Sequence, residues 1–159
     1  MDAARADSLI DGQLAADLRA AGLRATRPRL LVLGYLRRHT GTHHSAEQVT
    51  GALAEADQAL LRGSVYSVLA SLVAAGLVLV ADVGPGRTLY EASDRWHHHF
   101  VCRACGTVMD VSCVVGAKPC VDAGMPGAIV DEAQIIFRGL CPACTDGALD
   151  RAMPPSGRP

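Results

Sequence analysis

The feature that most constrains the fold of this chain is a pair of Cys-x-x-Cys motifs in its second half. The motifs supply Cys102, Cys105, Cys141 and Cys144. Two thiolates from each motif complete a closed tetrahedral zinc site, in which the metal ties together two segments that are distant in the sequence. Core cysteines without a metal and two separate redox motifs are the alternatives. The repeated spacing favours structural zinc over both.

The rest of the chain also favours metal over a disulfide framework. The first residues mix acidic and basic side chains and are not followed by the apolar segment of a signal peptide. The chain lacks the run of about 18 apolar residues that crosses a membrane. Six cysteines in such a chain indicate metal ligands or redox thiols. We therefore expect a cytoplasmic protein that does not bind membranes.

The net charge of −1 conceals an uneven distribution along the 159 residues. Seven arginines and three acidic residues lie between Arg19 and Val80, which gives this segment a net charge of +4. From Ala81 onward seven basic residues accompany nine acidic ones, and all six cysteines lie there. This division predicts two small domains. We assign them to residues 1–83 and 88–146, with a hinge at 84–87 and a disordered tail at 147–159.

The first half carries the apolar spacing of three or four short helices. Thr26 and Ser45 are suitable N-cap residues, and the last apolar face begins near Arg62. Apolar segments at 77–80 and 87–91 indicate two strands around a turn. Helices followed by a two-stranded wing are typical of a winged helix-turn-helix domain. A helical bundle with solvated arginines is the alternative that periodicity does not exclude.

A winged domain would insert its last helix into the DNA major groove. The leading turns of this helix carry polar side chains that can contact bases or phosphates. These side chains are Arg62, Ser64, Tyr66 and Ser67.

A second set of candidate metal ligands surrounds the sequence His97-His98-His99. On a strand, alternate residues lie on one face, so His97 and His99 can bind one ion while His98 points away. Further ligands are available at Glu91 and Asp110, which lie near these histidines in the sequence. The other half of the chain offers one more, either His43 or His44. Three imidazoles and two carboxylates suit Fe²⁺, Mn²⁺ or Zn²⁺. A solvated histidine loop is the alternative.

Together these residues resemble the ferric uptake regulator (Fur) family of metal-dependent bacterial repressors. The segments that carry the resemblance are 22–29, 43–47, 64–66, 75–77, 97–99 and the two Cys-x-x-Cys motifs. The resemblance implies an α+β fold, with an N-terminal winged helix-turn-helix domain and a C-terminal small α/β dimerisation domain that holds a four-cysteine zinc site. It also implies a homodimer that represses transcription at a palindromic operator in double-stranded DNA, with no enzymatic activity and no small-molecule substrate.

The resemblance also assigns residues. The regulatory metal, Fe²⁺ or else Mn²⁺ or Zn²⁺, falls on His43, Glu91, His97, His99 and Asp110, and the structural Zn²⁺ falls on the four paired cysteines. By the same resemblance Arg24 enters the minor groove and Tyr66 matches the tyrosine of the recognition helix, whereas Ser67 stands where the family usually has an arginine. The DNA contacts that we expect are Arg24, Thr26, Arg29, Arg62, Ser64, Tyr66 and Ser67. A further metal site of the family would need ligands near Trp96, Ala117 and Ala133, so we expect it to be absent.

The spacing of Glu91 and Asp110 around the first cysteine pair is similar to that of the peroxide-sensing (PerR) branch. This resemblance implies peroxide as the signal, sensed through Fe²⁺-catalysed oxidation of the histidine ligands, and control of catalase-type genes. Cys113 and Cys120 are spare thiols, either a pair that forms a disulfide on oxidation or two inert cysteines. The alternatives are an iron- or zinc-responsive repressor, a His/carboxylate metalloenzyme and a zinc-stabilised interaction module.

Overall fold

A computed structural model describes residues 3–84, 86–93, 95–116, 120, 124–130 and 133–145. The chain forms two compact units, Met1–Asp94 and Arg95–Pro159, which are described separately below. The predicted disordered tail at 147–159 lies outside the described residues. No helix in the described part of the chain is long and apolar enough to cross a membrane.

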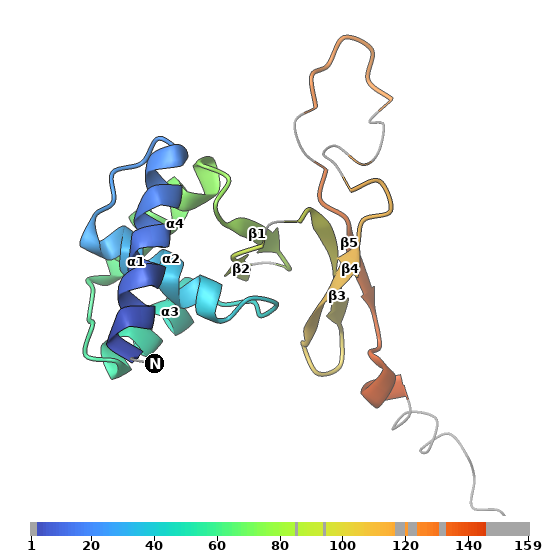
Figure 1. The fold of residues 1–159 in the computed structure, drawn as a ribbon. Coiled ribbons are helices and arrows are strands. Elements are labelled where there is room, and N and C mark those ends of the chain that lie inside the picture. The colour runs from blue at the N-terminus through green and yellow to red at the C-terminus, as the bar shows by residue number, and fades with distance from the viewer. Residues whose placement is uncertain are drawn as a thin grey trace, which may run out of the picture. The chain divides into compact units, whose positions relative to one another are not determined.

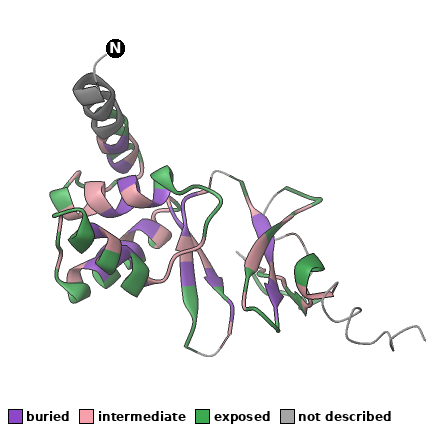
Figure 2. Ribbon diagram, turned by 90° about the horizontal axis from the view of Figure 1, so that it is seen from below, coloured by how far each residue is buried: buried purple, intermediate pink, exposed green. Residues whose placement is uncertain are grey.

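Four helices make up most of the first unit (Figure 1). They are α1 (Ala3–Ala20), α2 (Arg27–Arg38), α3 (Ala46–Glu55) and α4 (Arg62–Ala74). Buried residues gather where the described parts of these helices pack together (Figure 2), and Leu18, Leu33 and Leu69 are fully buried in their common core. Burial of these side chains, at about 25 cal/mol per Å² of apolar surface, is the main force that holds the helices together.

The start of α3 is determined by its own residues. Ser45 accepts a hydrogen bond from the backbone N–H of Gln48, and the Gln48 side chain accepts one from the Ser45 N–H. This capping box satisfies two backbone donors that a helix start would otherwise leave free.

A two-stranded wing follows α4. Strand β1 (Leu79–Asp82) pairs antiparallel with β2 (Thr88–Glu91), and Asp82 lies opposite Thr88. The predicted hinge at 84–87 falls between these two strands in the sequence, and the first unit extends to Asp94.

The second unit is built on a three-stranded sheet of β3 (His97–Cys102), β4 (Val108–Ser112) and β5 (Ile136–Gly139). The strand order is β4-β3-β5, with β3 antiparallel to β4 and parallel to β5. Gly139 leaves room for the Phe100 side chain of β3, since an added Cβ would lie 3.2 Å from Cε2 of its ring. Among the described residues of this unit, helical structure is confined to one turn at 142–145.

Candidate metal centres and nucleic-acid interface

The four paired cysteines converge at one end of the three-stranded sheet. Cys102 ends β3, and the second pair follows β5, the parallel neighbour of β3, so the strand pairing brings the two motifs together. Their Sγ atoms all lie within 4.8 Å of one another, and those of Cys105 and Cys141 are 3.7 Å apart. Zinc–sulfur bonds of about 2.3 Å place tetrahedral ligands about 3.8 Å apart. The donor set therefore fits a structural Zn²⁺, as predicted.

Hydrogen bonds in the turns beside the cysteines, and the neighbouring thiols themselves, change the pKa values of these side chains. Backbone N–H groups of Cys105 and Cys141 donate to the Cys102 sulfur and lower the pKa of Cys102 to about 6. The neighbouring thiols, Cys141 first, raise the pKa of Cys144 to about 12. Neighbouring thiols thus disfavour a second thiolate, and a cation bound among them would offset this effect.

The second unit contributes an imidazole–carboxylate group on one face of the sheet. His97 and His99 are both buried, and their ring centroids are 4.9 Å apart. Asp110 lies opposite His99 in the β3–β4 register, and its Oδ1 is 3.5 Å from His97 Nε2. The strand alternation predicted from the sequence is therefore present, with His98 on the opposite face. These side chains offer two nitrogens and one oxygen to an ion.

The first unit contributes a second, smaller group at the end of its wing. Residue 44 forms an antiparallel bridge with Tyr90, and this pairing brings His43 beside Glu91. His43 Nε2 is 3.5 Å from Glu91 Oε1, and both side chains are buried. A carboxylate is rarely buried unless it is paired or binds a cation. His43 and Glu91 thus add one nitrogen and one carboxylate as candidate ligands.

His44, the alternative to His43 in the sequence, is engaged elsewhere. Its Nδ1 is 3.2 Å from the Tyr35 hydroxyl, and its Nε2 is 2.7 Å from the Thr42 hydroxyl. Burial, followed by the nearby His39 and His43, lowers the pKa of His44. Both ring nitrogens of a neutral imidazole therefore have partners within the first unit, which suits a structural role.

The predicted DNA-contacting residues lie on two adjoining surfaces of the first unit. An open groove of about 490 Å³ runs between the start of α2 and α4. The predicted residues that line it are Arg24, Thr26, Arg29, Ser64 and Ser67. Arg29 donates to the Arg24 carbonyl (3.1 Å) and to the Ser71 hydroxyl (3.3 Å), so its guanidinium bridges the loop before α2 and the helix α4.

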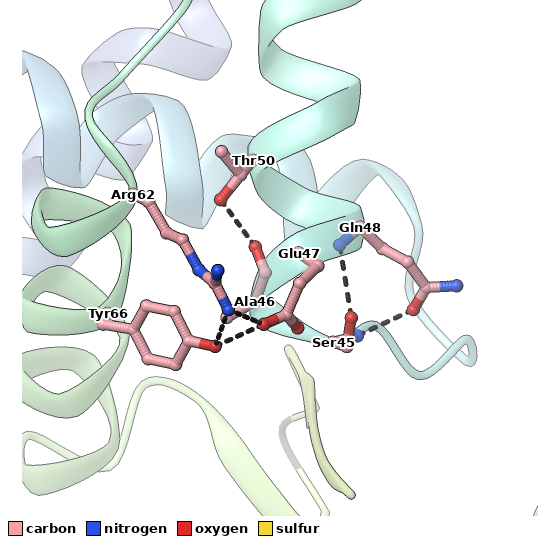
Figure 3. Close-up of polar contacts among 7 residues, drawn as sticks. All are labelled: Ser45, Ala46, Glu47, Gln48, Thr50, Arg62 and Tyr66. Atoms are coloured by element: carbon pink, nitrogen blue, oxygen red, sulfur yellow. Dashed lines mark hydrogen bonds and ion pairs between the residues drawn. The ribbon is translucent and has the colours of Figure 1, made fainter.

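The other two predicted residues, Arg62 and Tyr66, form a polar cluster with Glu47 of α3 (Figure 3). The Tyr66 hydroxyl donates to Glu47 Oε1 at 2.5 Å, and Arg62 donates to the same oxygen at 2.7 Å. The hydrogen bond from Tyr66 is the largest of several effects that lower the pKa of Glu47 to about 2. Tyr66 is still 40% exposed. Glu47 therefore holds two exposed side chains of α4 in a fixed arrangement.

Sequence reasoning assigned no role to Glu47. Its distance from Tyr66 along the chain hides the contact, and its place in the first turn of a capped helix gives it an ordinary helical explanation. A signal was present nonetheless, since Glu47 belongs to a segment that carries the family resemblance.

Comparisons with known proteins agree on one family. A profile described as the ferric uptake regulator family matches residues 20–114. The transcriptional regulator FurA of Mycobacterium tuberculosis is 42% identical over 143 residues, which cover 88% of this chain and 95% of FurA. Ferric uptake regulation protein 1 of Mycolicibacterium fortuitum is 41% identical over 123 residues, 76% of this chain and 74% of that protein.

Solved structures show the same fold. A ferric uptake regulator from Pseudomonas aeruginosa with manganese matches with a TM-score of 0.63 and 28% identity over 81% of this chain and 98% of that one. The regulator from Vibrio cholerae matches with a TM-score of 0.61 and 29% identity over 80% and 98%. The predicted fold class is confirmed. The chain belongs to the ferric uptake regulator family, and it is a DNA-binding, metal-responsive transcriptional regulator and not an enzyme.

Proposed function

We propose that this protein is a homodimeric repressor whose DNA affinity is set by one metal ion bound to His43, Glu91, His97, His99 and Asp110. The observation that carries the proposal is the buried pair His97 and His99 beside Asp110 on one face of the sheet. The His43–Glu91 pair of the first unit supplies the matching ligands. His43 is preferred to His44, because the latter uses both ring nitrogens in hydrogen bonds.

The mechanism follows from which unit supplies each ligand. Two of the five come from the DNA-binding unit and three from the other. When both groups bind the same ion, the angle between the units is fixed, and so is the spacing of the two α4 helices in a dimer. These helices must reach half-sites about one helical turn, or about 34 Å, apart. Without the ion, fewer dimers have that geometry, and the apparent affinity falls in proportion.

The second unit has features that support dimer formation. Its edge strand β5 carries Phe137, which is 45% exposed, and Val114 and Ile129 are almost fully exposed. Exposed apolar side chains and an open sheet edge are suited to a symmetric interface with a second copy. Light scattering on the zinc-loaded protein tests this, since a monomer at micromolar concentration would contradict it.

We propose peroxide as the signal. The five ligands are nitrogen and oxygen donors that suit Fe²⁺, and Fe²⁺ can reduce the O–O bond of hydrogen peroxide. In the net reaction one peroxide oxygen enters the imidazole ring of His43 or His97, and the other leaves as water. The oxidised ring loses affinity for the ion, and the repressor leaves its operator.

One experiment separates this signal from direct metal sensing. Protein loaded anaerobically with Fe²⁺, or with Mn²⁺ as the control, is treated with hydrogen peroxide and digested for mass spectrometry. One added oxygen on the His43 or His97 peptide, in the iron-loaded sample alone, supports peroxide sensing. Unmodified histidines together with DNA binding that follows free iron support an iron-responsive repressor, the alternative favoured by relatives named ferric uptake regulation proteins.

A further inference from the structure

The second face of β3 carries a separate group of possible ligands. His98 is 6% exposed and points away from His97 and His99. Val111 lies opposite His98 in the β3–β4 register, so the alternation of β4 puts Cys113, two residues later, on the same face as His98. Cys120 completes the group, and its Sγ is 3.2 Å from His98 Nε2. None of these residues belongs to the four-cysteine site or to the proposed regulatory site.

We infer that His98, Cys113 and Cys120 form a third metal site that takes a thiophilic divalent cation such as Zn²⁺. One donor atom from each residue lies within 4.8 Å of the other two. Tetrahedral zinc with bonds of about 2.0–2.3 Å needs nitrogen–sulfur distances of about 3.5 Å and sulfur–sulfur distances of about 3.8 Å. The His98–Cys120 distance of 3.2 Å is already close to the nitrogen–sulfur value, and shifts of at most about 1 Å bring Cys113 to the distances that tetrahedral zinc needs.

The surroundings of His98 fit a metal ligand better than an ordinary buried histidine. Its Nε2 faces a thiol, which is a weak hydrogen-bond partner, and its Nδ1 is buried with no hydrogen-bond partner among the described residues. Buried imidazoles normally have stronger partners than this. The Trp96 ring packs edge-on against the His98 ring, with 6.2 Å between the two ring centroids, and restrains the orientation of His98. A metal–nitrogen bond would compensate for the burial of His98.

The donor types distinguish this site from the other two. Two thiolates and one imidazole neutralise the charge of a divalent ion and favour Zn²⁺ over Fe²⁺ or Mn²⁺. Three protein ligands leave a fourth position for water or another ligand. Cys113 and Cys120 are both partly exposed, so the ion can exchange with solvent. We therefore expect weaker and more reversible binding here than in the closed four-cysteine site.

Cobalt titration tests the proposal on the full-length protein. The protein is purified anaerobically with its four-cysteine zinc retained, and Co²⁺ is added as the probe. We expect an extra equivalent with sulfur-to-cobalt charge-transfer absorption, lost in Cys113→Ser and in Cys120→Ser and weakened roughly tenfold or more in His98→Ala. His97→Ala is the matched control, and it should keep this absorption because its ligand set contains no sulfur. Absorption that persists in both serine variants would overturn the proposal.

A measurement on the unmodified protein covers the case in which the variants fold poorly. Bound Zn²⁺ should slow alkylation of Cys113 and Cys120 by iodoacetamide at least tenfold relative to protein that holds only the four-cysteine zinc, as read by peptide mass spectrometry. Equal alkylation rates with and without the second zinc would overturn the site. A Cys113–Cys120 disulfide that is already present in the isolated protein and prevents zinc binding would also overturn it, in favour of a redox pair.

Discussion

The two predicted metal centres differ in how their ligands are distributed along the chain. All four cysteines of the structural zinc site belong to the second unit, and strand pairing and two tight turns bring them together. The histidine and carboxylate ligands are divided between the units, with His43 and Glu91 in the first and three ligands in the second. A site enclosed by one unit can stabilise that unit, whereas ligands that come from two units can report on their arrangement.

The largest effect is expected when a ligand is removed from the four-cysteine site. We expect Cys102→Ser to lose the structural zinc and to unfold the second unit, since structural zinc sites contribute about 10–16 kcal/mol of apparent binding free energy. Metal analysis and circular dichroism measure the two effects. Cys113→Ser is the matched control and should keep one tightly bound zinc. Full zinc content in the Cys102 variant would show that the four thiols are not one site.

Removal of one of the histidine or carboxylate ligands should have the opposite effect, with the fold kept and the metal-dependent DNA binding lost. We expect His97→Ala to keep its structural zinc and fold but to lose metal-dependent binding to operator DNA, at least tenfold in a gel shift with added Mn²⁺. The reason is that the loss affects the angle between the units and not the core of either. A variant that still responds fully to Mn²⁺ would contradict the assignment of His97.

Substitutions of the adjacent residues His43 and His44 distinguish a metal ligand from a structural histidine within the first unit. His43→Ala should lose the Mn²⁺ response. His44→Ala should keep the Mn²⁺ response. It should lower the free energy of unfolding of the first unit by about 1 kcal/mol, because two side-chain hydrogen bonds are lost. Gel shifts and thermal melts of the two variants give both results. The reverse outcome would assign the ligand to His44.

The smallest expected effect concerns Glu47, which belongs to neither metal centre. Its pKa is lowered in the folded protein from 4.5 to about 2, so its contribution to stability is present above pH 4.5 and is lost as the pH falls toward 2. Glu47→Gln should therefore lower the melting temperature slightly at pH 7, and the difference from the unmodified protein should shrink at about pH 3. A difference that grows on acidification would contradict the hydrogen bonding described for Glu47.

The parts predicted correctly from the sequence depend on local rules. The capping box at Ser45 and the alternation of His97, His98 and His99 need only residues that are neighbours in the chain. Side-chain contacts between segments that are distant in the chain could not be found in this way. The partners of Glu47 and Cys120 were missed for a similar reason, since both contacts join distant segments.

The fit of Gly139 beneath Phe100 has a consequence for the identity of the bound ions. A shift of β3 by one residue relative to its neighbours would turn every side chain to the opposite face of the sheet. His98 would then face Asp110, and Phe100 would take the place of an imidazole. In the present alignment Gly139 lies opposite Cys102, and a Cβ at residue 139 would lie 3.2 Å from the Phe100 ring. The strand alignment thus decides which donors, and so which kinds of ion, each face of β3 can present.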